Sequence, residues 1–569
     1  MNRLVQSNRN DTLLRHISAA SESFWVTIAV FAIATGMLLW QVLGQFGISL
    51  IGQDSSFTLW SLWLPRRALW LNQDIMVTDY AVFPFKQNLL LVLSLLGSIL
   101  YALFSSLRLS PPLAFNLLYG ISIIFTGWAM AAYLLHLRVP RILALFAGLL
   151  LIFSPIMYYR LSQGYPTLMA LGWIPLGCLV WEQVRWVKRS LGESRRRHGV
   201  WLTVVWVGTV LTSLPLTFLA LVVWVPYIAV GILQTKRDER RKLIDHLLVQ
   251  ALVLLAVFMT YPLPGLLKTW AGLAPPAQAI SLQSFWQPTA GMMVIGCLWI
   301  GLVALSIVSL FQVNRLEAIT NRTTQLIWLG IGLLSLVFAM APGTGWFSSH
   351  QPWLSPVDWI SLASIAFCIF IALSLTSFWR QWQQRDRRII GLTTIPVAVL
   401  VLAIALQAAP PTIAWNASPA YAAIGKEAGD YAVLEVPFGI RSLTSGQQFG
   451  SGFDLQQYAV IHRKRTLNGS VAGSGTEAFT TYSNSPLFRY LAGEDGMSKT
   501  LVAELQTLVK SQQIGYVIVQ LTRLRPEHQA EFLNLFDEKT SSLCRVFKDS
   551  SMVIYRTTWH PFNCNQPLI

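Results

Sequence analysis

The sequence predicts a polytopic α-helical membrane domain followed by a C-terminal globular α/β domain. Of the 569 residues, 54% are hydrophobic and only 12% are charged, far from the usage of soluble proteins. Apolar runs long enough, or nearly long enough, to cross a bilayer succeed one another up to about residue 408. From Ala409 the apolar runs shorten, and Pro410, Pro411 and Pro419 indicate a linker. We therefore divide the chain into a membrane domain, 1–408, and a tail domain, 409–569.

The net charge of +16 does not indicate a nucleic-acid-binding surface. The tail is almost neutral, with 14 Lys+Arg against 13 Asp+Glu, which leaves 28 against 13 in the membrane domain. Most of this excess lies in short connections between apolar runs, and basic short loops are typical of the cytoplasmic side of a membrane. A nucleic-acid site would need the basic residues on one folded face. We expect membrane lipids, and no nucleic acid, as partners.

The positions of the basic loops predict eleven crossings. Four connections are clearly basic, namely 185–197, 236–242, 315–322 and 380–388. They all fall on the same, cytoplasmic side if one early run, 87–106, lies in the interface or re-enters instead of crossing. The N-terminus, which has no cleavage signal after its first run, is then cytoplasmic, and the tail is extracytoplasmic. The twelve apolar runs are 24–47, 87–106, 112–135, 141–156, 167–182, 201–213, 216–233, 245–263, 290–312, 326–341, 357–378 and 389–408.

The tail reads as a small α/β domain large enough for its own core. Buried strands are expected at 431–436 and 515–519, helices at 501–511 and 527–536, and a closing hairpin at 544–555. The charge run 462–465 is typical of a solvated face. Cys544 and Cys564 pair if the tail lies in an oxidising compartment, or stay reduced if it does not. We expect neither a metal site nor a cofactor, because no cluster of His and Cys residues occurs.

The first external loop, 48–86, holds the candidate catalytic group. Sugar transfer from a lipid phosphate needs a base for the acceptor's proton, cations for the leaving phosphate and a groove for the lipid chain. Asp54 follows the first span within a few residues, so its carboxylate lies at the membrane surface, and it is the candidate base. The alternative is that Asp54 caps a helix beginning at Ser55 or Ser56, since Asp is a favoured N-cap residue.

Cations for a lipid phosphate are available in two external segments. Arg66 and Arg67 belong to the first loop and can bind a phosphate through the guanidinium fork, or simply bind lipid headgroups at the interface. The external turn 158–166 offers Arg160, with Gln163 and Tyr165 beside it. Arg160 is either a second phosphate anchor or an ordinary interfacial side chain.

The chain resembles the GT-C superfamily of multi-span membrane glycosyltransferases. The resemblance rests on short motifs spread over most of the chain: Gly52-Gln53-Asp54, Pro84, Asn116, Phe153-Ser154-Pro155, Trp173-Ile174-Pro175-Leu176, Val433 to Gly439, His462 and Asn468-Gly469. It implies about eleven spans, a polyprenyl-phosphate-linked sugar donor and Asp54 as the base. One departure is that many members carry a second acidic residue where this chain has Arg160 and Gln163, which argues against a metal site held by two carboxylates.

Two functions of different classes follow. The first is a glycosyltransferase of a bacterial inner membrane that moves a sugar from a polyprenyl-phosphate lipid to an extracytoplasmic acceptor. The second is a non-catalytic subunit or lipid-binding scaffold whose tail docks a protein partner. A transporter is less favoured, because almost no ionisable residue falls at mid-span depth.

Overall fold

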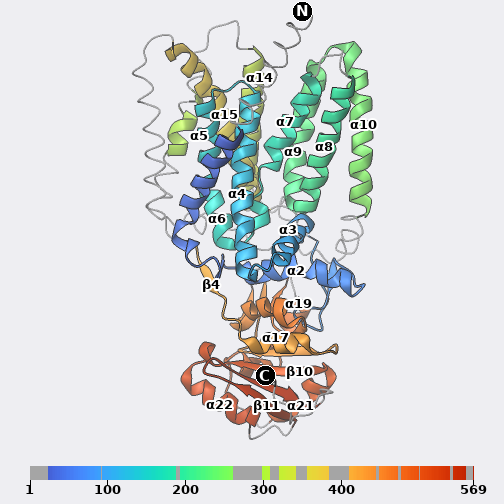
Figure 1. Cartoon of the computed structure of the whole chain (residues 1–569), viewed down its shortest axis with the longest axis vertical. Coiled ribbons are helices and arrows are strands. Elements are labelled where there is room, and N and C mark those ends of the chain that lie inside the picture. The colour runs from blue at the N-terminus through green and yellow to red at the C-terminus, as the bar shows by residue number, and fades with distance from the viewer. Residues whose placement is uncertain are drawn as a thin grey trace, which may run out of the picture.

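The protein is elongated, with a helical bundle at one end and the tail at the other (Figure 1). The computed structural model describes residues 24–90, 92–186, 192–260, 298–304, 306–307, 319–340, 355–383, 409–443, 447–471, 476–496, 498, 500–537, 542–558 and 568. The helix α2 (Ser55–Trp70) of the first loop and the helix α3 (Leu95–Ser106) of the run 87–106 lie between the bundle and the tail (Figure 1).

The bundle consists of long apolar helices. Among the described residues, six are long and apolar enough to cross a membrane, and a seventh span results if α5 and α6, which bend by 41° at their junction, are counted as one. The predicted count of eleven is not tested, since 261–297, 308–318 and 384–408 lie outside the described residues. The bundle helices are Phe24–Leu43, α4 (Pro111–His136), α5 (Arg141–Ile152), α6 (Pro155–Gln163), α7 (Trp173–Trp186), α8 (Gly192–Thr212), α9 (Leu214–Gln234), α10 (Arg237–Thr260), α14 (Ile319–Met340) and α15 (Pro356–Gln383).

The run 87–106 has a form that suits an interfacial position. It begins as a short strand, β3 (Gln87–Asn88), which pairs with β2 (Val77–Thr78), and continues as the 12-residue helix α3. A helix of that length spans roughly 18 Å, well short of the ~30 Å hydrocarbon core of a bilayer. Gly97 lets α3 lie close to its neighbours, because a Cβ there would be 2.9 Å from a Leu62 methyl and 2.6 Å from Thr167.

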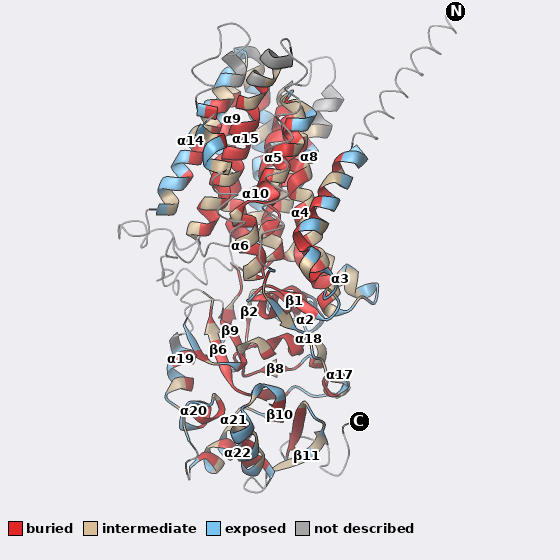
Figure 2. Ribbon diagram, turned by 90° about the vertical axis from the view of Figure 1, so that its left-hand side faces the viewer, coloured by how far each residue is buried: buried red, intermediate tan, exposed pale blue. Residues whose placement is uncertain are grey.

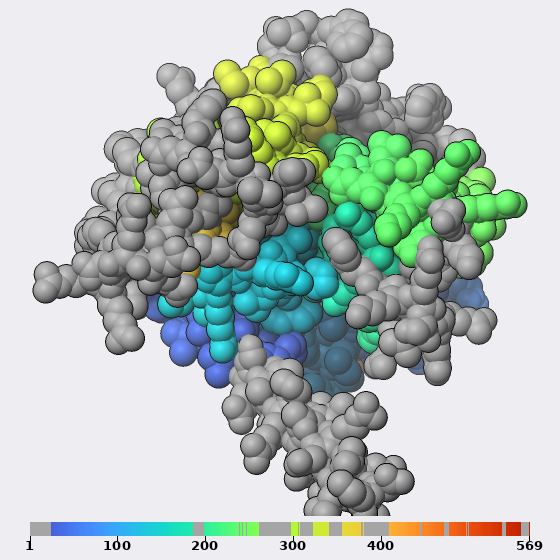
Figure 3. Space-filling model, turned by 90° about the horizontal axis from the view of Figure 1, so that it is seen from above, coloured from blue at the N-terminus to red at the C-terminus, as the bar shows by residue number. Residues whose placement is uncertain are grey.

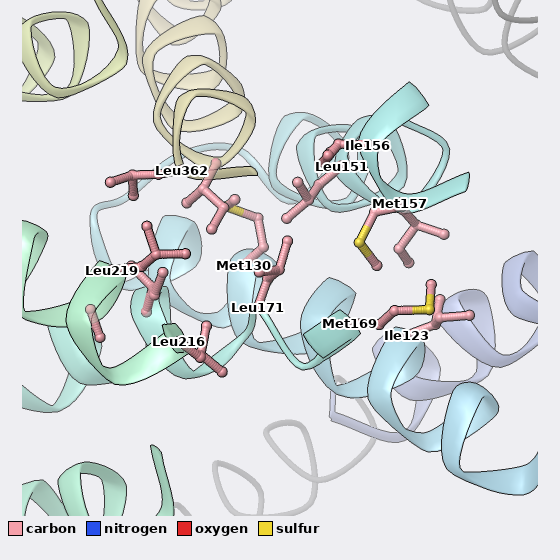
Figure 4. Packing of buried hydrophobic residues seen from close by; sticks show 14 of the residues in the cluster. Ile123, Met130, Leu151, Ile156, Met157, Met169, Leu171, Leu216, Leu219 and Leu362 are labelled. Atoms are coloured by element: carbon pink, nitrogen blue, oxygen red, sulfur yellow. The ribbon is translucent and has the colours of Figure 1, made fainter. Parts of the chain in front are cut away.

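The interior of the bundle combines apolar packing with close approach at glycines. Many residues of the bundle helices are buried (Figure 2), and Figure 4 shows Met130, Met157 and Met169 among the packed aliphatic side chains. Gly177 of α7 lies against the indole of Trp224 of α9, where a Cβ would be 2.3 Å from the ring. Helices α7 and α9 therefore fit together only because position 177 has no side chain.

The basic connections lie at the end of the bundle that is remote from the tail. Figure 3 views this end, where the α4–α5 connection (cyan), the α9–α10 connection (green) and the start of α14 (yellow) are all visible. Lys236 and Arg322 belong to two of the four connections that are clearly basic in sequence, and Arg138 belongs to the weakly basic connection between α4 and α5. The described basic connections thus share one end, as the loop charges predict.

The tail is built on a five-stranded mixed sheet with the order β11-β12-β10-β5-β8. Its two central strands are parallel and completely buried, while β11 and β12 form an antiparallel hairpin next to them. A smaller sheet has the order β7-β6-β9. The tail elements are β4 (Thr412–Ala414), α17 (Pro419–Lys426), β5 (Ala432–Val436), β6 (Gly439–Ser442), β7 (Gln448–Gly450), η4 (Gly452–Tyr458), α18 (Ala459–His462), β8 (Arg465–Thr466), β9 (Gly469–Val471), α19 (Thr476–Ser483), α20 (Pro486–Leu491), α21 (Leu501–Ser511), β10 (Ile514–Gln520), η5 (Leu521–Arg523), α22 (Pro526–Asp537), β11 (Leu543–Lys548) and β12 (Met552–Thr557).

The first loop is part of the tail's structure and not only its neighbour. Strand β1 (Ser49–Ile51) pairs antiparallel with β4 of the tail. Further along the loop, the Phe83 amide donates to the Thr466 carbonyl at 2.9 Å, and Val82 and Phe83 belong to the hydrophobic core of the tail. The boundary at residue 409 therefore separates two segments of sequence that form a common core.

The prediction that the charge run 462–465 is a solvated face is wrong. His462 and Lys464 are buried, and only Arg463 is fully exposed. The Lys464 ammonium donates to the carbonyls of Glu427 and Gly429 at 2.7 and 2.9 Å, and His462 Nε2 lies 3.8 Å from Glu435 Oε1. His462 and Lys464 are thus buried against groups of the tail itself, while Arg465 faces the first loop, with Nη1 3.7 Å from Asp79 and the guanidinium over the Phe83 ring.

Cysteine pairing is visible for one member of the expected pair. Cys544 is disulfide-bonded, while Cys564 lies outside the described residues. The pairing of Cys544 with Cys564 therefore stays a prediction. The two other described cysteines, Cys178 and Cys368, are buried free thiols.

Replacing Gly177 by Ala is expected to destabilise the bundle by about 1–3 kcal/mol, because the added methyl group overlaps the Trp224 ring. The measurement is the apparent Tm of the purified protein in detergent. Gly120→Ala on α4 is the matched control, since a Cβ at Gly120 meets nothing within 4 Å. Equal Tm values for both variants would contradict the close α7–α9 contact.

Candidate functional site

The loop before Asp54 is held by backbone contacts with the C-terminal end of α6. The prediction of a turn at 158–166 is wrong for its first part, because residues 158–163 belong to the helix α6 (Pro155–Gln163) and the chain turns only at Gly164, where φ is +99°. Gly52 has φ +100°, and a Cβ there would be 2.2 Å from the Cα of Gly164, so the two segments touch through their main chains. The amides of Gln53 and Asp54 donate to the carbonyls of Ser162 and Gln163, both at 2.8 Å. The structure thus brings together the two segments in which the sequence analysis places the candidate site.

The side chain of Asn116 on α4 holds the start of this loop through hydrogen bonds to its main chain. Its Nδ2 donates to the carbonyls of Phe46 and Ser49 at 3.0 and 2.7 Å, and its Oδ1 accepts from the Ile51 amide at 3.2 Å. The Tyr119 hydroxyl donates to the Ile51 carbonyl at 3.1 Å. Because Asn116 is fully buried, these bonds are shielded from water and hold the loop in one position.

Asp54 stands at the N-cap position of α2, but its carboxylate is directed elsewhere. Its side chain makes no capping hydrogen bond to the described helix. Instead, Oδ1 lies 2.7 Å from Nη1 of Arg441, and Oδ2 accepts from the Tyr165 hydroxyl at 3.2 Å. The residue is 8% exposed. Asp54 therefore occupies the N-cap position of α2, but its carboxylate does not cap the helix. Its carboxylate contacts Arg441 and Tyr165 instead.

Burial decides the protonation behaviour of this cluster. Desolvation raises the pKa of Asp54 above its ordinary value, and the Arg441 cation and the Tyr165 hydrogen bond offset only part of that rise. The pKa of Tyr165 is well above its ordinary value, because the ring is buried and faces the Asp54 carboxylate. Tyr165 therefore remains a neutral donor, and Asp54 is a stronger base than an exposed carboxylate.

Arg160 has a different environment from the one that the sequence predicts. It is 3% exposed, and its guanidinium donates to Asp358 at 2.7 Å, to the Ser361 hydroxyl at 3.0 Å and to the Leu168 carbonyl. Asp358 lies in the first turn of α15, so the ion pair joins α6 to α15. This geometry gives no support to a phosphate site at Arg160, because all three donor nitrogens bind the protein itself.

Arg66 and Arg67 lie toward the other end of α2 from Asp54. Twelve residues of helix separate Arg66 from Asp54 along the axis, which corresponds to roughly 18 Å. Arg66 is exposed, and Arg67 is partly buried and donates to the Arg463 carbonyl at 3.4 Å. The structure therefore brings Gln163, through its carbonyl, and Tyr165, through its hydroxyl, to Asp54, but not these two arginines.

Arg441 is the residue of the site that the sequence analysis missed. It lies on β6 of the tail, two residues after the end of the Val433-to-Gly439 motif, and its guanidinium stacks 5.4 Å from the centre of the Phe453 ring. No local pattern marks it, because its partner lies in the first loop. The contact could have been expected only from the pairing of β1 with β4, because this pairing brings the start of the tail next to the first loop.

Two cavities are lined by described residues. One of about 820 Å³ is apolar and lies between α3, α7, α8 and α10, with Leu96, Trp173, Val204 and Val253 in its wall. The other, of about 470 Å³, is polar and is lined by Asp74, Asp79 and Lys86 among others. Asp54 is outside the described lining of both. Among the described residues, no group of three His, Cys, Asp or Glu side chains is arranged to hold a metal ion.

Comparison with known proteins rests on structure alone. No family model matches the sequence, and no curated protein matches it. Arabinofuranosyltransferase AftD from Mycobacteria superposes with a TM-score of 0.57 at 15% identity, over 94% of this chain. The match covers 40% of AftD, so the chain spans about two fifths of that protein's length.

Two further solved proteins are more distantly similar. The oligosaccharyltransferase of Archaeoglobus fulgidus has a TM-score of 0.46 at 12% identity, over 94% of this chain and 74% of that one. ArnT from Cupriavidus metallidurans, solved bound to undecaprenyl phosphate, has a TM-score of 0.38 at 13% identity, over 96% of this chain and 99% of that one. Of the three, AftD alone exceeds 0.5, and at this level of identity the likeness establishes a shared fold.

Arg160→Met is expected to destabilise the protein by about 3–5 kcal/mol, because it leaves the buried Asp358 carboxylate without its cation. The double variant Arg160→Met with Asp358→Leu should recover much of that loss, since it removes both charges. Apparent Tm values of the two variants and of the parent measure the effect. A double variant as unstable as the single one would show that the ion pair is not what holds Arg160 in place.

Proposed function

We propose, from the premise that this chain is a multi-pass membrane protein with the GT-C glycosyltransferase fold, that it transfers a sugar from a polyprenyl-phosphate lipid to an extracytoplasmic acceptor. The observation that carries the proposal is Asp54. It is a buried carboxylate with a raised pKa at the junction of the bundle and the tail, directed away from the helix that it precedes. Such a group is suited to general-base catalysis.

The proposed reaction uses Asp54 as the acceptor of one proton. The acceptor hydroxyl attacks C1 of the donor sugar and forms the new C1–O bond, while the C1–O bond to the phosphate breaks. The polyprenyl phosphate leaves with the bonding electron pair, and the hydroxyl proton passes to the Asp54 carboxylate. Tyr165 and the Gln163 carbonyl hold the carboxylate and its main chain in place during this step.

Orientation in the membrane follows from charge. The described basic connections lie at the end of the bundle opposite the tail, and basic short loops favour the cytoplasm. We therefore place the N-terminus in the cytoplasm of a bacterial cell and the tail outside its inner membrane. The disulfide at Cys544 supports this assignment, because disulfides persist in oxidising compartments.

The lipid part of the donor has two supports. ArnT, one of the similar proteins, was solved with undecaprenyl phosphate. In this chain, the apolar cavity of about 820 Å³ has Leu96 of α3 in its wall, and the neighbouring Gly97 lies against Thr167, two residues beyond Tyr165. An isoprenoid chain in this cavity would bring its head toward the site. Arg66 and Arg67 remain proposed contacts for the phosphate or for surrounding headgroups.

A non-catalytic membrane subunit or lipid-binding scaffold is the second candidate. The observation that favours it is the Asp54–Arg441 ion pair, which would serve to fasten the tail to the first loop even if no reaction occurred there. In that case the tail would be free to dock a protein partner.

Asp54→Asn decides between the two. If the protein is a glycosyltransferase, Asp54→Asn should reduce the product by about 100-fold or more in a cell-envelope glycan assay, at unchanged protein level. The reason is that the side-chain amide of the variant cannot accept the proton. Asp74→Asn is the matched control, since Asp74 lies in the same loop but is an exposed residue that accepts from the Met76 amide. Wild-type product from Asp54→Asn would favour the scaffold.

Tyr165→Phe should shift the pH dependence of activity. Only ionised Asp54 accepts a proton, so activity falls as the pH is lowered through its pKa. The Tyr165 hydrogen bond lowers that pKa, and its removal therefore moves the acid limb to higher pH. Tyr158→Phe, which removes a hydroxyl that donates to the Ala409 carbonyl at 3.4 Å, is the control. An acid limb that moves to lower pH, or does not move, would remove Asp54 from the base role.

A further inference from the structure

Arg441 is the cation closest to the candidate base, and it keeps donor capacity for a ligand. A guanidinium carries five N–H donors. Among the described residues, that of Arg441 has one polar partner, Oδ1 of Asp54, and the side chain is 23% exposed. Arg160, in contrast, is 3% exposed, and each of its three nitrogens donates to a protein group. Of the cations considered above, Arg441 alone combines contact with the carboxylate and open donors.

The main chain of Arg441 is fixed within a sheet of the tail, while its side chain extends to Asp54 in the first loop. Strand β6 pairs with β7 on one side and β9 on the other, and Arg441 itself lies opposite Gln448 and Ser470. Gly439, at the start of β6, is so close to η4 that a Cβ would be 2.4 Å from the Gly452 amide. The Phe453 ring beside the guanidinium limits where it can move. Arg441 is thus a partly exposed cation on a fixed strand, placed to bind an anion that comes to this junction.

We propose that Arg441 binds the phosphate of the lipid donor, and that the phosphate oxygens replace the Asp54 carboxylate as its partner. This inference rests on the proposed function and adds the tail to the catalytic site. A guanidinium binds phosphate through two parallel N–H···O bonds, which a single contact to Oδ1 does not use. Arg441 would thus gain hydrogen bonds in the exchange.

The exchange couples donor binding to activation of the base. While Arg441 pairs with Asp54, it stabilises the carboxylate and reduces its affinity for a proton. Once the guanidinium has moved to the phosphate, Asp54 keeps only Tyr165 among its described side-chain partners and becomes more basic. As C1–O cleavage proceeds, charge accumulates on the departing phosphate, where Arg441 is then placed to stabilise it.

Binding of undecaprenyl phosphate and of undecaprenol to the full chain in nanodiscs tests the proposal, with Asp54→Asn, Arg441→Gln and Arg441→Lys compared with the wild type. The wild type should bind the phosphate lipid more tightly than the alcohol. Arg441→Gln should weaken binding of the phosphate lipid about 10–100-fold, the loss expected for hydrogen bonds to a charged group, and leave undecaprenol binding unchanged. Arg441→Lys, which keeps the charge without the fork, should lie between the two.

Asp54→Asn separates this inference from the proposed function. It should abolish transfer while binding undecaprenyl phosphate as tightly as the wild type or more tightly, because the competing anion is gone. Equal binding of undecaprenyl phosphate by Arg441→Gln and the wild type would overturn the phosphate site, as would equal weakening of both lipids, which indicates a purely structural role. If Asp54→Asn keeps its activity while Arg441→Gln loses only phosphate affinity, the base assignment fails and the phosphate site stands.

Discussion

The ion pair of Asp54 with Arg441 joins the first loop to the tail at the candidate site. Asp54 follows the first membrane helix, and Arg441 belongs to the tail that comes after the last one. Around this contact, β1 pairs with β4, and the second half of the first loop completes the core of the tail. The tail is therefore not an independent domain, since it shares a strand pair and its hydrophobic core with the first loop. Its position relative to the membrane surface is set by the same contacts that orient the candidate base.

Burial gives this pair its chemical character. An exposed Asp–Arg pair would contribute little to stability and would leave the carboxylate ordinary. Here the desolvation of Asp54 outweighs the neighbouring cation, so that its pKa is raised although it is paired. The ion pair is thus strong enough to orient the carboxylate without making it a weak base. This balance also means that removal of the cation changes the protonation of Asp54 more than its position, which Gln163 and Asn116 fix through the main chain.

The sequence was informative where a property is local. Composition indicates a membrane protein, the distance of Asp54 from the first span indicates a carboxylate at the surface, and the loop charges agree with the common end of the described basic connections. It was not informative about pairing across long separations. Arg160 looked like an available cation because nothing nearby in sequence shows that Asp358 neutralises it. Arg441 had no signal of its own. The run 462–465 looked solvated because the tail groups that bind His462 and Lys464 are not adjacent to it in sequence.

The most direct measurement is an experimental structure of the full chain in nanodiscs with undecaprenyl phosphate. The account predicts phosphate density within hydrogen-bonding distance of the Arg441 guanidinium, with the Asp54–Arg441 contact opened and Asp54 still bound to Tyr165. Phosphate density away from Arg441, with Asp54 and Arg441 still paired at the distance seen here, would contradict it.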